Sequence, residues 1–185
     1  MNQKPTTCSA LGDGMTRRSF LLHSGAATVT IMLSGIPGMA KAAQIPAWVQ
    51  TYERVRLVRL SDIKRHTPIY FEYPDLSSSC FLVQMDGEAG SGVGPGKDIV
   101  AFHNNCTHMG GPLHGTYRQE YGAVGPCPFH LTSFDIRRHG MVIAGHATES
   151  LPQVVLEVES DWVYATAMMG LIYGRVANIS EEGHE

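Results

Sequence analysis

Two short stretches decide what this chain can bind: residues 106–108 read Cys-Thr-His, and residues 127–130 read Cys-Pro-Phe-His. Each stretch offers one thiol and one imidazole on a turn framed by glycine or proline. Thiolate and imidazole are both ligands of transition metals. Because the same pair of residue types recurs on neighbouring loops, the sequence predicts a metal centre to which both loops contribute.

The predicted metal ligands are Cys106, His108, Cys127 and His130. A tetrahedral zinc could take two cysteines and two histidines, but the zinc ligands of one pair usually stand two to four residues apart. Only one residue separates Cys106 from His108, so the two side chains suit two neighbouring ions better than one. In a Rieske [2Fe–2S] centre, two histidines replace two cysteines on one of the irons. Zinc, or a chance grouping of buried thiols and core histidines, is the alternative.

The residues around these loops have the pattern of short β-strands. Alternation of apolar and charged residues over 55–60 is the period-two signature of a half-buried strand. Because no helical period is sustained, the sequence predicts an all-β, antiparallel sandwich or barrel, with a short helix only near 45–54 or 116–122. The predicted strands cover residues 55–60, 69–73, 80–85, 99–102, 134–136, 141–143, 154–158, 162–165 and 171–173.

The N-terminal segment has the features of an export signal. The pair Arg17-Arg18 precedes a weakly apolar stretch that contains glycines and a proline and ends in Ala-Lys-Ala at 40–42. That stretch is a poor membrane span, and small residues flank the predicted cleavage site. We therefore expect a twin-arginine signal peptide over 1–42, a mature domain over 43–185 and a periplasmic location. An uncleaved anchor is the alternative, and contact with a membrane is expected only in that case.

Length and composition limit the class of protein. The chain has 185 residues, of which 43% are hydrophobic and 17% charged, and its formal net charge is −3. This composition excludes a largely disordered protein. The near balance of charge gives no basic excess for nucleic acid, so nucleic acid is not an expected partner.

The chain resembles the Rieske iron–sulfur proteins, and among them the small subunit of arsenite oxidase. The family resemblance covers about residues 95–160 and includes Gly145 to Pro152, which is similar to the proline loop that covers the cluster in the family. The leader, the short mature domain and the segment 127–135 point to the arsenite oxidase branch. The resemblance implies a β-sandwich base domain, an inserted cluster-binding subdomain at about 101–152 and one Rieske [2Fe–2S] cluster per chain.

The resemblance also implies a function, which is electron transfer without a catalytic residue or a substrate-converting site on this chain. The implied partner is a large catalytic subunit that holds a molybdenum–pterin cofactor and a [3Fe–4S] cluster and oxidises arsenite. Electrons would then pass to a periplasmic cytochrome c or an azurin-like copper protein. The alternatives are a Rieske subunit of a quinol:cytochrome c oxidoreductase or of another periplasmic redox enzyme, and a Rieske ferredoxin that serves an oxygenase.

Four further residues are expected to tune or brace the cluster. Many high-potential members of the family carry an additional cysteine in each loop, joined as a disulfide, where this chain has Gly111 and Phe129. No such disulfide can form here, and we expect the Phe129 ring to lie over the Gly111 backbone instead. By motif alignment, Thr132 stands where high-potential members have a serine near a bridging sulfide, and Phe134 where they have a tyrosine that donates to a cysteine sulfur. An intermediate reduction potential follows.

Apolar residues near the histidines are expected to cover the cluster or to contact a partner. The ring edges of His108 and His130 that do not bind iron would be the port for electrons. Met109, Leu113 and Pro152 are predicted to form an apolar rim around this port. The alternative for these three residues is a role in the ordinary core of the loops.

Overall fold

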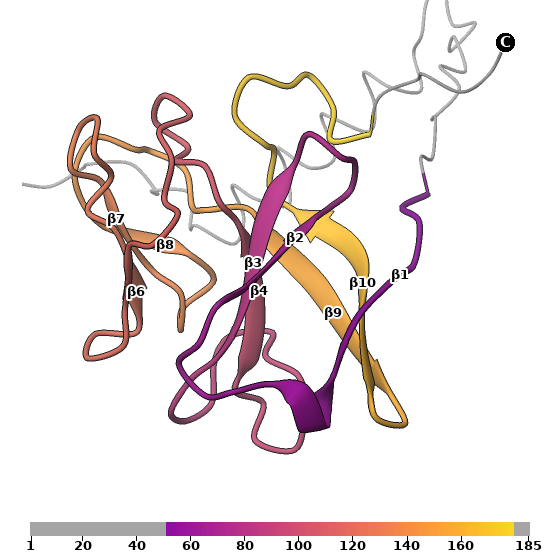
Figure 1. The fold of residues 1–185 in the computed structure, drawn as a ribbon. Helices are drawn as coiled ribbons and strands as arrows, with labels where there is room; N and C mark the ends of the chain where they lie inside the picture. The colour runs from indigo at the N-terminus through magenta and orange to yellow at the C-terminus, as the bar shows by residue number, and fades with distance from the viewer. Residues whose placement is uncertain (1–50, 180–185) are drawn as a thin grey trace, which may run out of the picture. The chain divides into compact units, whose positions relative to one another are not determined.

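The computed structural model describes residues 51–179, which form two antiparallel β-sheets (Figure 1). The predicted signal peptide over 1–42 lies outside the described residues. The larger sheet has six strands in the order β1-β10-β9-β4-β3-β2, and the smaller has four in the order β5-β6-β7-β8. This architecture confirms the predicted all-β, antiparallel fold class.

The strand bounds follow the alternation seen in the sequence to within a few residues at most ends. The strands are β1 (Val55–Arg59), β2 (Ile69–Glu72), β3 (Ser79–Gln84), β4 (Ile99–His103), β5 (Tyr117–Arg118), β6 (Ala123–Val124), β7 (Ser133–Asp135), β8 (Met141–Ala144), β9 (Gln153–Glu159) and β10 (Trp162–Met169). Among the described residues, the helical structure is one 3₁₀ turn, Leu60–Asp62.

Three of the predictions about secondary structure are wrong or fall outside the described part. Residues 171–173 form no strand, because Gly170 and Gly174 hold positive φ on either side and turn the chain. The candidate helix at 116–122 is instead β5 and the turn that follows it. Most of the other candidate helix, 45–54, lies before the described residues. Strands β5 and β6 are each two residues long, which is too short to show an alternation of apolar and polar residues.

Strands β3 and β4 form the centre of the fold, because both of their faces are buried. Side chains alternate across a strand, so Phe81 and Phe102 lie in one apolar cluster, together with side chains of the smaller sheet. Their neighbours Leu82 and Ala101 lie in the other cluster, with residues of β1, β9 and β10. All five residues of β4 are buried, as expected for a strand that is covered on both sides.

The smaller sheet is inserted between two strands that are neighbours in the larger sheet. The chain leaves β4 after His103 and returns at the start of β9, where Phe102 pairs with Gln153. The backbone N–H of His103 donates to the Pro152 carbonyl at 2.8 Å. The two ends of the insertion are therefore held side by side. Of the subdomain predicted at about 101–152, residues 101–103 belong to β4 of the larger sheet.

A membrane-crossing helix is not found within residues 51–179, since no helix there is both long enough and apolar enough.

Replacement of Phe102 by alanine is expected to lower the free energy of unfolding by about 3–5 kcal/mol. The Phe102 side chain is fully buried, and its ring lies against Gly140 of the inserted subdomain, where an added Cβ would be 3.0 Å from Phe102 Cε1. Urea unfolding measures the change. Val158→Ala, at a partly exposed position of β9, is the matched control. An equal loss in both variants would contradict the central role of Phe102.

Candidate metal centre

The two predicted half-sites are closed by the same pair of backbone hydrogen bonds. In the first loop, the Gly110 N–H donates to the Cys106 carbonyl and the Cys106 N–H donates to the Gly111 carbonyl, both at 2.8 Å. In the second loop, the Leu131 N–H donates to the Cys127 carbonyl at 2.9 Å, and the Cys127 N–H donates to the Thr132 carbonyl at 2.8 Å. Each cysteine therefore begins a closed turn of the same size.

The histidines occupy different positions in these matching turns. His108 is two residues after its cysteine, whereas His130 is three residues after its own. The fifth residue of each turn, counted from the cysteine, has a left-handed backbone. Its φ is +67° at Gly110 in the first turn and +59° at Leu131 in the second. Glycine adopts that conformation freely, but leucine does so at a cost. The strained Leu131 was not anticipated from the sequence.

The two cysteine thiols are buried and lie beside one another. Cys106 and Cys127 belong to the same apolar cluster as the interior of the smaller sheet. Burial raises the pKa of the Cys106 thiol, and the neighbouring Cys127 raises it further. Hydrogen bonds from the His108 backbone N–H and from the Thr132 hydroxyl act in the other direction on that pKa. Two thiols held together away from water are a donor set that suits a metal centre.

The two histidine rings meet at the tip of the loops. The ring centroids of His108 and His130 are 4.7 Å apart, and the rings stand at 88° to one another. His108 Nδ1 is buried and has no hydrogen-bond partner in the structure. A buried, unsatisfied nitrogen is costly, and a metal ion bound at Nδ1 would satisfy it. The residues present therefore fit a metal group held by both loops.

Among the described residues, no three Cys, His, Asp or Glu side chains converge on one point that could hold a metal ion.

A third histidine lies beside these two rings. His146 is exposed, and its ring centroid is 5.6 Å from that of His108 and 6.3 Å from that of His130. It belongs to the loop from Gly145 to Pro152 that follows β8. From the sequence, His146 is expected to have a structural or solvent-facing role and not to bind metal, because the two cysteine–histidine loops already supply four ligands.

Thr132 connects that loop to the cysteines. Its side chain is buried, and Oγ1 accepts hydrogen bonds from the backbone N–H groups of His146 at 3.1 Å and Ala147 at 3.4 Å. The same hydroxyl donates towards Cys106 Sγ, which lowers the pKa of that thiol. Thr132 therefore has the backbone contacts of a structural residue, and its hydroxyl also lowers the pKa of a predicted ligand.

Phe129 and Phe134 differ in their surroundings. Phe134 is fully buried in the cluster of apolar residues that contains both cysteines. Phe129 packs against Gly111, where an added Cβ would lie 3.0 Å from Phe129 Cδ2 and 2.6 Å from Cys127 Sγ. The structure thus places the Phe129 ring on the bare backbone of Gly111, while 57% of the residue's surface stays exposed.

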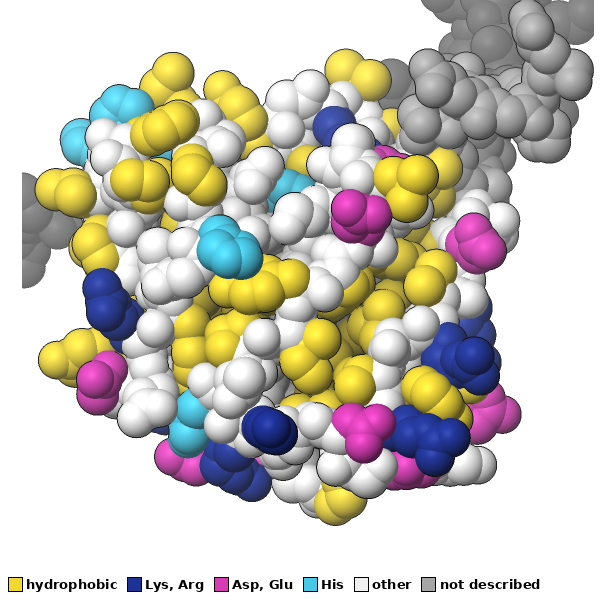
Figure 2. Space-filling view, in the orientation of Figure 1, with side chains coloured by type: hydrophobic (Ala, Val, Ile, Leu, Met, Phe, Trp, Pro, Cys, Tyr) yellow, Lys and Arg dark blue, Asp and Glu magenta, His cyan; other side chains and the backbone are white. Residues whose placement is uncertain are grey.

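Two of the three residues predicted for the apolar rim are buried. Leu113 is 2% exposed and Pro152 is buried, which favours the alternative of a place in the core of the loops. Met109 is exposed as expected, and the other exposed apolar side chains at the loop tips are Phe129 and Leu131. Figure 2 shows histidine and hydrophobic side chains gathered at the upper left, where Figure 1 draws the loops around β6, β7 and β8.

Comparison with known proteins gives a family match over most of the described chain. The Rieske [2Fe-2S] domain matches residues 55–155. Iodate reductase subunit IdrB of Denitromonas iodatirespirans is 53% identical over 164 residues, which cover 89% of this chain and 86% of that protein. The same-named subunit of Pseudomonas sp. (strain SCT) is 50% identical over 160 residues, which cover 86% of this chain and 82% of that protein.

A solved structure supports the fold. The soluble domain of Rieske protein II from Sulfolobus acidocaldarius matches with a TM-score of 0.59 at 21% identity, over 68% of this chain and 83% of that one. The cofactor of this chain is a Rieske-type [2Fe–2S] cluster. With its two matching cysteine–histidine turns and these likenesses, the chain belongs to the Rieske [2Fe-2S] domain family.

Proposed function

We propose that this chain is the electron-transfer subunit of an oxidoreductase of the kind that iodate reductase represents. The observation that carries the proposal is the 53% identity to an iodate reductase subunit over 89% of the chain. Identity at this level over almost the whole chain extends well beyond the loops that all Rieske domains share.

Cys106, Cys127, His108 and His130 are proposed to hold the cluster. When bound, a Rieske cluster supplies one-electron transfer with no open coordination position for a substrate. Two thiolates and two neutral imidazoles bring less negative charge than four thiolates would, so the ligand set favours acceptance of an electron. Burial of both cysteines keeps water from the sulfur side of the site.

The exposed edge of the site is the proposed port for electrons. His130 is exposed and His108 is partly exposed, whereas both cysteines are buried, so the site can be approached from the histidine side. Met109, Phe129 and Leu131 surround this edge with exposed apolar surface. Such a surface suits contact with another protein.

Conversion of the substrate is assigned to a large partner subunit. We propose that this partner holds a molybdenum–pterin cofactor and a [3Fe–4S] cluster, in line with the resemblance to the arsenite oxidase branch. Two substrates then imply opposite directions of electron flow. Arsenite oxidation would deliver electrons through this chain to a cytochrome c or an azurin-like protein, whereas iodate reduction would draw electrons through it into the partner. The identity to the two IdrB subunits favours iodate.

The proposed location is the periplasm, reached by the twin-arginine route with cleavage after Ala42. The support is the paired arginines and the Ala-Lys-Ala sequence at 40–42. Cell fractionation with N-terminal sequencing is the test. Release from membranes with residue 43 at the N-terminus is expected, and a chain retained in the membrane with its leader would favour the quinol:cytochrome c oxidoreductase alternative.

Purification of the native complex through a tag on this chain tests the function. We expect a large molybdenum-containing partner, and we expect iodate to remove the electron paramagnetic resonance signal of the reduced cluster. Arsenite that instead generates this signal from the oxidised complex would establish the arsenite oxidase alternative. A partner without molybdenum, together with no response to either compound, would overturn the proposal. His130→Ala is the control that lacks one proposed ligand.

Thr132→Val is expected to lower the reduction potential of the cluster. Hydrogen bonds to the ligand sulfurs stabilise the reduced, more negative state, and valine has no hydroxyl to donate towards Cys106. Redox titration followed by circular dichroism or paramagnetic resonance measures the potential. Thr132→Ser keeps the hydroxyl and should stay close to the wild-type potential, so a similar fall in both variants would contradict this role.

Phe134→Tyr is expected to raise the potential by the same physical argument. By motif alignment Phe134 stands where high-potential members have a tyrosine that donates to a cysteine sulfur, and it is buried in the apolar cluster that includes both cysteines, so we expect an added hydroxyl to donate to sulfur. The same titration applies. An unchanged or lower potential would show that the hydroxyl finds another partner.

A further inference from the structure

The tip of the first cluster loop is held by two aromatic rings from different parts of the chain. An added Cβ at Gly111 would lie 3.0 Å from the ring of Phe129, and one at Gly110 would lie 3.0 Å from Cδ1 and 3.3 Å from Cε1 of Tyr173. Phe129 belongs to the second loop. Tyr173 belongs to the segment that follows β10, which no family motif in the sequence includes. Each of the two adjacent glycines is thus in contact with one aromatic ring.

Tyr173 is presented by a tight turn. The Arg175 N–H donates to the Ile172 carbonyl at 3.1 Å, and Gly174 has a φ of +81°. These two features describe a β-turn with Tyr173 at its second position and glycine at the third, where positive φ favours glycine. Ile172 is buried in the core of the larger sheet, so the turn projects from a fixed base.

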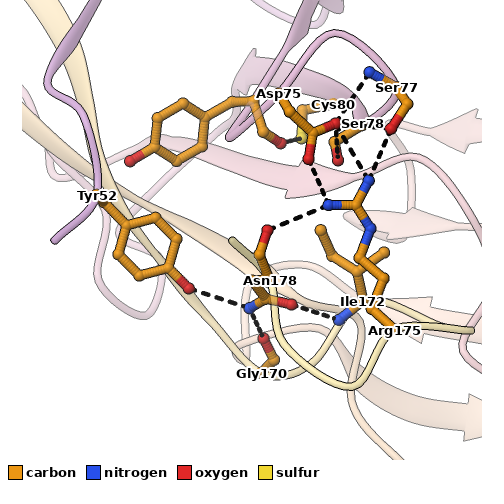
Figure 3. Close-up of polar contacts among 10 residues, drawn as sticks. Tyr52, Asp75, Ser77, Ser78, Cys80, Gly170, Ile172, Arg175 and Asn178 are labelled. Carbon is orange, nitrogen blue, oxygen red and sulfur yellow. Dashed lines mark hydrogen bonds and ion pairs between the residues drawn. The ribbon is translucent and has the colours of Figure 1, made fainter. Parts of the chain in front are cut away.

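Asn178 fixes the start of this turn by its side chain (Figure 3). Its Oδ1 accepts the Ile172 N–H at 2.9 Å, and its Nδ2 donates to the Gly170 carbonyl at 2.7 Å and to the Tyr52 hydroxyl at 3.1 Å. Asn178 is itself buried. Each hydrogen bond to a buried amide helps to define one conformation, because an unpaired group there would be costly.

Arg175 joins the turn to the connection between β2 and β3 (Figure 3). Its guanidinium forms a two-point ion pair with the Asp75 carboxylate and donates to Ser77 Oγ at 2.8 Å and to the Asn178 carbonyl at 3.1 Å. This arginine holds the pKa of Asp75 well below its usual range. Paired, planar contacts of this kind are specific in geometry and less mobile than a single exposed ion pair.

We propose that residues 170–178, here called the C-terminal clamp, position the first cluster loop, with Tyr173 as the positioning residue. The anchors of the clamp lie in the larger sheet and its connections, and its ring bears on Gly110. The clamp therefore transmits the position of the larger sheet to the loop that carries Cys106 and His108. This inference rests on the proposed ligand assignment.

The clamp compensates for the disulfide that Gly111 and Phe129 cannot form. The second loop is tied into the smaller sheet directly, because Thr132 precedes β7. The first loop continues from β4 and is closed by its own backbone hydrogen bonds, and it also has contacts from outside, among them the Thr107 hydroxyl, which donates to the Glu149 carbonyl at 2.8 Å. With Phe129 and Tyr173 on the two glycines, the loop is restrained by both the second loop and the clamp.

Hydrogen–deuterium exchange on the full-chain holoprotein tests the clamp. In Tyr173→Ala we expect the amides of residues 106–111 to exchange about tenfold faster, while β9 and β10 exchange as in wild type. Loss of the visible cluster absorbance in the presence of an iron chelator should accelerate in parallel. Tyr173→Phe should restore both rates, because the contact with Gly110 is made by ring carbons and not by the hydroxyl. Arg175→Ala keeps the ring, removes its anchor and should also accelerate both rates.

Two matched controls separate positioning from general stability. Val176→Ala changes a fully exposed side chain within the same segment, and Tyr121→Ala removes an exposed ring from the connection between β5 and β6. Both should behave as wild type. Exchange in Tyr173→Ala that is unchanged, or that rises equally in β9 and β10, would overturn the clamp. A wild-type protein without a Rieske signal would instead refute the ligand assignment, so the two failures are distinguishable.

Discussion

Two cysteine sulfurs buried side by side are the constraint on which the rest of this structure depends. Cys106 and Cys127 lie in an apolar cluster, where like charges repel strongly and water cannot screen them. If both cysteines are ionised, their burial is stable only when a cation lies between the loops and the surrounding groups donate hydrogen bonds to sulfur. The matching turns, the buried Nδ1 of His108 and the hydroxyl of Thr132 all supply parts of that environment.

The larger sheet makes such an environment possible because it fixes both ends of the inserted subdomain. Strands β4 and β9 are paired neighbours, so the chain departs and returns at one place. The first loop is an extension of a fully buried strand, and the second is a connection within the smaller sheet. The loops that bear the site residues are thus positioned by rigid strands, which is a common arrangement for functional sites.

Local patterns in the sequence were sufficient for the fold class, for the longer strands and for the two half-sites. Alternation of apolar and charged residues predicts strands such as β1 directly. Cys-Thr-His at 106–108 indicates metal ligands without any knowledge of the fold. The patterns failed where a residue's role depends on distant partners. The apolar run at 171–173 resembles a strand, but Asn178 and two glycines bend it into a turn. His146 and Tyr173 reach the site only through the tertiary fold. The sequence left open whether Leu113 belongs to a rim or to the core, and the structure buries it.

The left-handed backbone at Leu131 introduces strain at the exposed apolar edge of the site. Glycine serves the equivalent place in the first turn, whereas here a leucine is 66% exposed in a conformation that side chains disfavour by about 1–2 kcal/mol. A chain selected for folding alone would have relaxed this position. Glycine at position 131 would relieve this strain and raise the melting temperature, but it would also remove an exposed apolar side chain from the proposed port for electrons.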